Sequence, residues 1–422
     1  MLQIAEIREN KDVFAKALQK RNIDALPLLE NAIKVDEQRR SIQGQLDETL
    51  AKSNKLSKEI GELYKSGKAA EANELKKQTA DLKESSKQLG DQLNEAVVKL
   101  QTLLYEIPNI PQESVPAGNT DEDNEVVSQH GEIPVLHEGA KPHWELVKDY
   151  DIIDFELGNK ITGAGFPVYK NKGARLQRAL INYFLDKNTE AGYDEMQVPH
   201  LVNEASGYGT GQLPDKEGQM YHVGVDDLYL IPTGEVPITN IYRDTILEAK
   251  DFPITMTGYT PCFRREAGSY GSDVRGLNRL HQFDKVEILR IEHPDKSDGA
   301  LDAMVVHVKG ILEELELPYR ILRLCGGDLG FTSTLTYDFE VYSTAQEKWL
   351  EVSSVSNFKT FQANRLKLRY RAEKGTELAH TLNGSALALP RILASILENY
   401  QTTDGIKIPK VLIPYCGFDT ID

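Results

Sequence analysis

The chain of 422 residues has little cysteine and no long apolar run. Its three cysteines are widely spaced: Cys262, Cys325 and Cys416. This spacing does not fit a zinc knuckle or a disulfide framework, so we predict free thiols in a reducing compartment. No apolar stretch reaches the ~20 residues that span a bilayer. The early acidic residues Glu6, Glu9 and Asp12 are unlike a transit peptide or a secretion signal. We therefore expect a cytoplasmic protein that does not bind a membrane.

Proline is absent from Leu28 to Tyr105, although the chain contains 18 prolines. Without this helix breaker, the stretch can form two long helices. Apolar residues recur every seven positions in each half: Leu28, Val35, Ile42, Leu56 and Leu63, then Leu75, Leu82, Leu89, Ala96 and Leu103. This period is typical of a coiled coil, and Gly67 supplies the reversal between the halves. We predict an antiparallel helical hairpin over about residues 28–105, with arms of roughly 55 Å.

The seam between the two predicted helices is not apolar throughout. Counting outward from Gly67 places Thr49 and Ser53 roughly opposite Ser86 and Thr79. We expect local flexibility at this polar stretch, midway along the hairpin.

Lysines cluster on the distal half of the hairpin, and six of them are candidate phosphate contacts: Lys52, Lys55, Lys58, Lys76, Lys77 and Lys83. Glutamates are interspersed, so a solvated, salt-bridged face is an equal alternative. A coiled coil without other context is most often an oligomerisation or spacer element. The net charge of −16 does not favour phosphate binding, but affinity for RNA depends on local patches.

The most informative segment, from Thr260 to Leu289, has two alternating apolar/polar stretches around a glycine-rich turn. A hairpin there would gather cations, an aromatic ring and carboxylates on one face: Arg264, Glu266, Arg279, Phe283 and Glu287. Guanidiniums bind phosphates in a fork, an aromatic face stacks a purine, and a carboxylate accepts from an ammonium or hydroxyl. The set suits ATP beside an amino acid. An amphipathic hairpin with solvated charges is the alternative.

Three further blocks accompany this hairpin: IPTGEVP at 231–237, EVSS at 351–354 and TLNGSALALPR at 381–391. In order and spacing, the four blocks resemble the signatures of seryl-tRNA synthetases of bacterial type, which are class II aminoacyl-tRNA synthetases. The Phe-Arg-x-Glu stretch is similar to class II motif 2. Residues 191–202 resemble motif 1, and residues 386–393 resemble motif 3.

The resemblance implies an α+β fold, in which a long antiparallel coiled-coil hairpin precedes a class II catalytic domain with an antiparallel sheet flanked by helices. We predict a tRNA-binding helical domain over 1–107, an acidic linker over 108–125 and the catalytic domain over 126–422. Helical patterns occupy 4–19, 174–191, 299–315 and 386–398. No Gly-x-Gly-x-x-Gly turn opens a helix, so a Rossmann site is unsupported.

The same resemblance implies catalytic and ATP-binding roles in motifs 2 and 3. Arg264 would hold the α-phosphate and the serine carboxylate, and Arg391 would brace the γ-phosphate. Arg279 would contact the bent triphosphate, Phe283 would stack on adenine, and Glu266 would accept from the adenine amine. Preplaced cations are needed because charge develops when the serine carboxylate attacks the α-phosphate. For each residue the alternative is a structural ion pair or a core aromatic.

The family pattern also implies a Mg²⁺ site at Glu351 and Ser354. Around the serine ammonium and hydroxyl it implies a second set of residues: Thr233, Glu235, Arg264, Glu287, Asn383 and Ser385. Residues from Ser269 to Arg275 are expected to contact the acceptor end of tRNA, with an ordinary hairpin loop as the alternative.

The implied function is that of an ATP-dependent serine–tRNA ligase, which forms seryl-adenylate and pyrophosphate and then transfers serine to the 3′ end of tRNA(Ser). Use of tRNA(Sec) is left open. Motif 1 implies a homodimer. A carrier-protein amino acid ligase would share the catalytic domain but lack the hairpin. A non-catalytic RNA-binding paralogue would keep the hairpin but lose active-site groups.

Overall fold

The structure is a computed structural model that describes residues 1–266 and 275–422. The chain forms two compact units. One contains residues 1–19 and 23–108, and the other contains residues 20–22 and 109–422. The predicted boundaries of the helical domain, linker and catalytic domain remain predictions. Within the described residues, no helix combines the length and the apolar character needed to cross a membrane.

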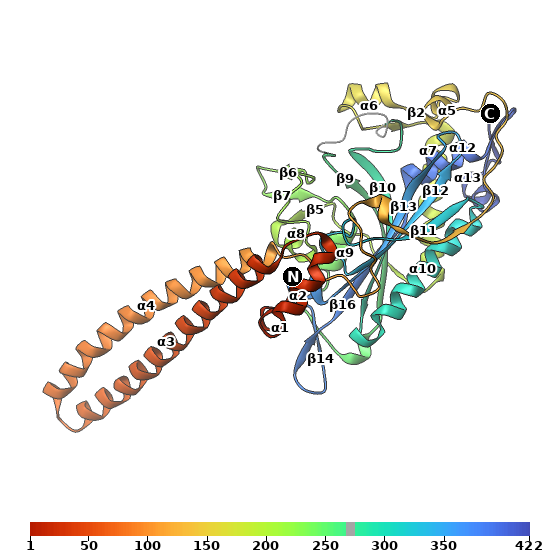
Figure 1. The fold of residues 1–422 in the computed structure, drawn as a ribbon. Helices are drawn as coiled ribbons and strands as arrows, with labels where there is room; N and C mark the ends of the chain where they lie inside the picture. The colour runs from red at the N-terminus through yellow and green to blue at the C-terminus, as the bar shows by residue number, and fades with distance from the viewer. Residues whose placement is uncertain (267–274) are drawn as a thin grey trace. The chain divides into compact units, whose positions relative to one another are not determined.

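The first unit is helical (Figure 1). Its two long helices, α3 (Leu26–Lys65) and α4 (Ala69–Tyr105), pack along one another as the predicted hairpin. Gly67 lies in the turn with φ of +75°, which a side chain would make costly. The single helix predicted over 4–19 is wrong. The structure has α1 (Ile4–Glu9) and α2 (Lys11–Leu18), separated at Asn10, whose ψ of 28° is not helical.

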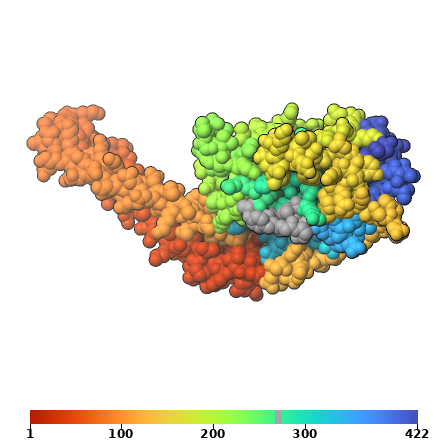
Figure 2. Space-filling view, turned by 90° about the horizontal axis from the view of Figure 1, so that it is seen from above, coloured from red at the N-terminus to blue at the C-terminus, as the bar shows by residue number. Residues whose placement is uncertain are grey.

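The polar stretch predicted in the seam is confirmed by burial. Thr79 is buried, and Thr49, Ser53 and Ser86 are partly buried, while their helix neighbours are mostly exposed. The hydroxyls of Thr49, Thr79 and Ser86 donate to the carbonyl four residues earlier in their own helix. These bonds satisfy the hydroxyls locally, so they add no cross-helix cohesion. On the face of the hairpin that Figure 2 shows, both helices lie at the surface.

We expect amide hydrogen exchange to be faster in residues 49–53 and 79–86 than in residues 28–42 and 93–103. The reason is that the middle of the seam replaces apolar contacts with locally bonded hydroxyls. Mass spectrometry of exchanged peptides would measure this. Equal or slower exchange at the middle would contradict the prediction.

The second unit is built on an eight-stranded sheet, in the order β1-β11-β12-β13-β16-β10-β9-β4. The strands in that order are Glu125–His130, Tyr319–Arg323, Leu335–Ser343, Lys348–Lys359, His380–Ala388, Gln282–Glu292, Ile254–Phe263 and Asp194–Glu195. All neighbours pair antiparallel except β4 and β9. Ala388 pairs with Lys285 of β10, so residues 386–388 belong to a strand and not to the predicted helix.

Helices flank this sheet (Figure 1). The helices of this unit include α5 (His143–Asp149), α7 (Asn171–Glu190), α8 (Glu204–Thr210), α9 (Glu235–Asn240), α10 (Ser297–Glu314), α11 (Thr360–Leu366) and α12 (Leu389–Asn399). The other helices are α6 (Phe155–Ile161) and α13 (Ile413–Cys416). Small sheets join β2 (Ile153–Asp154) with β3 (Val168–Tyr169), and β5 (Leu201–Asn203) with β7 (Leu228–Leu230) and β6 (His222–Val223). A third small sheet contains β15 (Thr376–Leu378), β14 (Arg369–Arg371) and β8 (Ile246–Leu247). A fourth contains β17 (Gln401–Thr402), β18 (Gly405–Lys407) and β19 (Thr420–Ile421).

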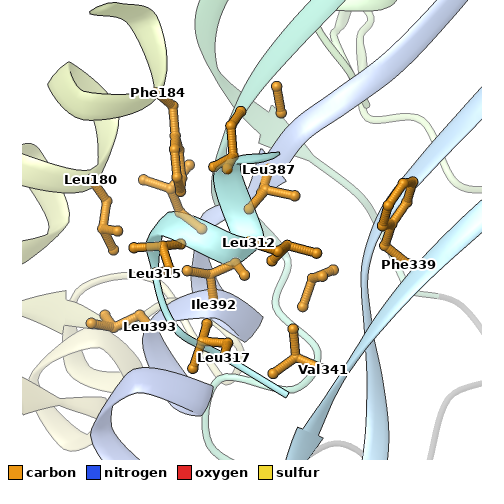
Figure 3. Packing of buried hydrophobic residues seen from close by; sticks show 14 of the residues in the cluster. Leu180, Phe184, Leu312, Leu315, Leu317, Phe339, Val341, Leu387, Ile392 and Leu393 are labelled. Atoms are coloured by element: carbon orange, nitrogen blue, oxygen red, sulfur yellow. The ribbon is translucent and has the colours of Figure 1, made fainter. Parts of the chain in front are cut away.

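The main core lies between one face of the large sheet and helices α7, α10 and α12. Figure 3 shows Phe184 of α7, Leu312 of α10 and Ile392 of α12 packed together beside strand residues. On β10 the even-numbered Val286 and Ile288 belong to this core. Because side chains alternate along a strand, the odd-numbered positions of β10 face the other side of the sheet.

Candidate active site

The predicted hairpin is formed by β9 and β10. Phe263 at the end of β9 pairs with Gln282 at the start of β10. The odd-numbered face of β10 presents Phe283, Lys285 and Glu287, as alternation requires. Arg264 follows β9 directly, and its backbone N–H donates to the His281 carbonyl at 2.9 Å. The local pairing therefore brings both ends of motif 2 together.

A cavity of about 740 Å³ lies on this face of the sheet. Its lining contains most of the predicted site residues: Thr233, Glu235, Arg264, Glu266, Arg279, Glu287, Glu351, Ser354, Asn383, Ser385 and Arg391. Phe283 lines a smaller cavity of about 220 Å³, which shares Arg264, Arg279 and Arg391 with the first. Residues predicted from four separate sequence blocks thus meet in one place.

One end of the cavity is a cluster of buried carboxylates. Thr233 Oγ1 donates to Glu287 Oε1 at 2.6 Å, and the ammonium of Lys285 contacts the same oxygen. Gln362 Nε2 donates to Glu235 Oε1 at 2.6 Å. Burial raises the pKa of Glu235 to about 7, and the nearby charge of Glu287 adds to this effect. Such a pocket can bind an ammonium group and a hydroxyl.

The other end holds three guanidiniums. Arg264 Nε donates to the Pro232 carbonyl at 3.2 Å, and its guanidinium carbon lies 5.2 Å from the centre of the Phe283 ring. Arg279 Nε is 3.2 Å from Glu266 Oε2. Arg391 Nη1 donates to the Glu351 carbonyl at 2.7 Å. These cations, grouped beside an aromatic ring, suit a nucleotide triphosphate.

The residues expected to hold Mg²⁺ offer hard oxygen donors. The Glu351 side chain is half-exposed, and Ser354 pairs with Asp338 across β12 and β13. Asp338 Oδ1 is buried and has no hydrogen-bond partner among the residues that the structure describes. Burial, together with the Glu351 charge, holds the pKa of Asp338 well above its usual range. Two carboxylates and a hydroxyl, completed by phosphate oxygens, fit the way Mg²⁺ is bound beside nucleotides.

Sequence reasoning missed several lining residues. Lys285 lies two residues from both Phe283 and Glu287, so the alternation of β10 could have identified it. Asp338 depends on the pairing of β12 with β13, which no local pattern predicts. Gln219 accepts from the Arg265 N–H at 2.8 Å through its carbonyl and from the Glu266 N–H at 3.1 Å through Oε1, and it had no sequence signal.

The predicted tRNA contacts are not among the lining residues that the structure describes. Arg275 is exposed, with its guanidinium carbon 5.6 Å from the centre of the Trp144 ring. Ser269 lies outside the described residues. The six hairpin lysines, Lys52, Lys55, Lys58, Lys76, Lys77 and Lys83, belong to the first unit and are all exposed.

Comparison with known proteins identifies the family of both the helical hairpin and the catalytic unit. Residues 221–400 match the model of the tRNA synthetase class II core domain (G, H, P, S and T), and residues 1–111 match that of the seryl-tRNA synthetase N-terminal domain. The serine–tRNA ligase of Salinibacter ruber is 50% identical over 100% of this chain and 99% of its own. That of Chlorobium chlorochromatii is 46% identical over 100% of both chains. The crystal structure of seryl-tRNA synthetase from Pyrococcus horikoshii complexed with ATP has a TM-score of 0.91, 32% identity and coverage of 100% and 99%.

The antiparallel sheet and the guanidinium-lined cavity define a class II aminoacyl-tRNA synthetase. The full-length identities to serine–tRNA ligases show which family of this class it is. The chain belongs to the seryl-tRNA synthetase family, and its activity is the ATP-dependent ligation of serine to tRNA.

Proposed function

We propose that this cavity binds L-serine and ATP side by side, forms seryl-adenylate with release of pyrophosphate, and passes serine to the 3′ end of tRNA(Ser). The observation that supports this most is the joining of a buried carboxylate pocket and three guanidiniums in one cavity. Holding both reactants there converts a bimolecular attack into one within a single complex.

Arg264 is the guanidinium next to the carboxylate pocket, because it contacts the Pro232 carbonyl beside Thr233 and also the Phe283 ring. It orients the serine carboxylate toward the α-phosphate and stabilises the charge that develops there. Arg279 and Arg391 hold the β- and γ-phosphates. Phe283 stacks on adenine, and Glu266 accepts from the adenine amine.

Glu235 and Glu287 bind the ammonium and hydroxyl of serine, and Thr233 orients Glu287. Asn383 and Ser385 shape the neighbouring wall of the cavity. Alanine lacks the hydroxyl and would leave a buried acceptor unpaired, which can cost on the order of 10⁴-fold in favourable sites. Threonine adds only a methyl group, so its rejection rests on crowding and is worth ~1–3 kcal/mol.

Glu351 and Ser354, with Asp338 behind them, would hold Mg²⁺ together with ATP. When bound, this ion neutralises phosphate charge and fixes the shape of the triphosphate. Arg391 also contacts Glu351, so the carboxylate is held in place before the nucleotide binds.

The helical hairpin holds tRNA(Ser) through its lysines. Further elements of the proposal are a homodimer built on motif 1, whose strand β4 ends the large sheet, and a cytoplasmic location, where tRNA is charged for translation. Arg275 and Ser269 are proposed contacts of the tRNA acceptor end.

We expect the triple variant K52A/K55A/K83A to bind tRNA(Ser) more weakly and with less salt dependence. Losing three phosphate contacts should reduce the slope of log Kd against log salt by about 2 to 3. Filter binding across a salt series measures the slope. Serine-dependent ATP–pyrophosphate exchange, which needs no tRNA, should not change. The matched control is K148A/K160A/K250A, which removes three exposed lysines of the second unit. Equal effects of both triples would contradict specific binding by the hairpin.

The direct test of the function is charging of tRNA(Ser) with radiolabelled serine. We expect label in acid-precipitable tRNA only when both enzyme and ATP are added to the labelled serine and tRNA(Ser). Absence of label with an intact tRNA(Ser) transcript would contradict it.

A further inference from the structure

A buried polar cluster lies beside the ATP end of the cavity. It joins His143 of α5, Glu398 of α12, and Ser343 and Gln346 at the β12–β13 turn. The side chains of His143 and Glu398 have no exposed surface. A buried carboxylate is costly unless its oxygens accept several hydrogen bonds, so this cluster needs an explanation.

Glu398 is the acceptor at the centre of the cluster. Its Oε1 accepts from the His143 backbone N–H at 2.8 Å, from His143 Nδ1 at 2.6 Å and from Gln346 Nε2 at 2.9 Å. Its Oε2 accepts from Ser343 Oγ. Glu398 thereby fixes both the start of α5 and the ring of His143.

The other side of the His143 ring holds the segment that leads to Arg279. The backbone N–H of Leu277 donates to His143 Nε2 at 2.8 Å. Because Nε2 accepts, the ring proton must be on Nδ1, where it is donated to Glu398. The imidazole is therefore neutral, and its tautomer is fixed from both sides.

Two further bonds hold the next residue. Asn278 Nδ2 donates to Gln346 Oε1 at 2.9 Å, and the Asn278 carbonyl accepts from Arg391 Nε at 3.1 Å. The chain also approaches His143 closely, since a Cβ on Gly276 would lie 2.3 Å from Nε2, and its φ is +61°. Residues 276–278 are thus held against the cluster, directly before Arg279 in the chain.

We propose that His143, oriented by Glu398, is a positioning residue for ATP: it holds residues 277–278 so that Arg279 and Arg391 reach the triphosphate. The proposal rests on the proposed function, in which these two arginines bind ATP. The cluster has no hydrogen bond to Thr233, Glu235 or Glu287 among the described residues. Loss of His143 should therefore affect ATP and leave serine binding unchanged.

Two variants separate the sides of the ring. H143N retains an amide donor near Nδ1 for Glu398 but loses the acceptor for Leu277. H143Q places its amide oxygen near Nε2 and retains that acceptor. We expect H143N to raise the KM for ATP about tenfold and to lower kcat/KM for ATP by up to about 10²-fold, as misplaced binding groups can. The KM for serine should stay within about twofold, and H143Q should stay within about threefold of the parent for both substrates.

The measurement is serine-dependent ATP–pyrophosphate exchange with each substrate varied, on protein whose folding is checked by thermal melting. The matched control is H380N, because His380 is also buried, bonds Ser297 Oγ through Nδ1 at 2.7 Å and does not line the cavity. If H143N fails to fold, Q346M is the deciding variant, because it removes the bonds that Gln346 makes to Asn278 and to Glu398. We expect it to raise the KM for ATP and not for serine.

The inference is overturned if folded H143N keeps the parent KM for ATP, if both KM values rise together, or if Q346M leaves the KM for ATP unchanged when H143N cannot be tested. A parent enzyme without serine-dependent exchange would instead contradict the proposed function. The two failures can therefore be told apart.

Discussion

Replacing Arg264 with alanine is expected to lower serine-dependent ATP–pyrophosphate exchange by about 10²- to 10³-fold. Removal of one preplaced group that stabilises developing charge costs this much in other enzymes. Arg264 contacts both the Pro232 carbonyl beside Thr233 and the Phe283 ring, so its guanidinium is held next to both proposed substrates. The exchange rate at saturating serine and ATP measures the effect.

The adjacent Arg265 provides the matched control. Its side chain is exposed and does not line the cavity, and its fixed contact is a backbone bond to Gln219, which alanine retains. We expect the ATP–pyrophosphate exchange rate of R265A to stay within about twofold of the parent rate, as is usual for surface changes. Equal losses in R264A and R265A would contradict the role given to Arg264.

The KM for serine should rise about tenfold as the pH falls from 8 to 6. Burial raises the pKa of Glu235 to about 7, so the carboxyl is mostly ionised at pH 8 and mostly protonated at pH 6. Only the ionised form balances the ammonium of serine, and a single group of this pKa gives about this change. Serine affinity is thus present above the pKa and is lost as the pH falls through it.

E235Q tests the assignment, because glutamine keeps the shape and cannot ionise. The variant should bind serine more weakly at pH 8, with a KM that no longer changes between pH 6 and 8 through this group. A parent KM that is flat over this range would refute the assignment, as would an unchanged pH profile in E235Q.

Local patterns were enough to predict the two elements that define the function. The seven-residue period and the lack of proline predicted the hairpin of α3 and α4, and alternation predicted the face of β10 that carries Phe283 and Glu287. These patterns succeed because burial along one helix stripe or one strand face is set by neighbouring residues.

Features that depend on distant partners were not predicted. Glu398 and His143 are 255 residues apart, and their bond depends on the packing of α12 against α5. Asp338 reaches the cavity through the register of β12 with β13. Residues 386–388 carry a helical pattern, but pairing with β10 extends strand β16 through them. In each case tertiary pairing overrides or adds to the local signal.

The most direct test of the account is ATP–pyrophosphate exchange without tRNA, with serine, threonine, alanine and glycine compared at equal concentration. The account predicts strong exchange with serine, exchange lower by about 10- to 200-fold with threonine, and none measurable with alanine or glycine. If none of the four amino acids supports exchange, or if alanine is as active as serine, the claim that this cavity activates serine through its buried carboxylates is contradicted.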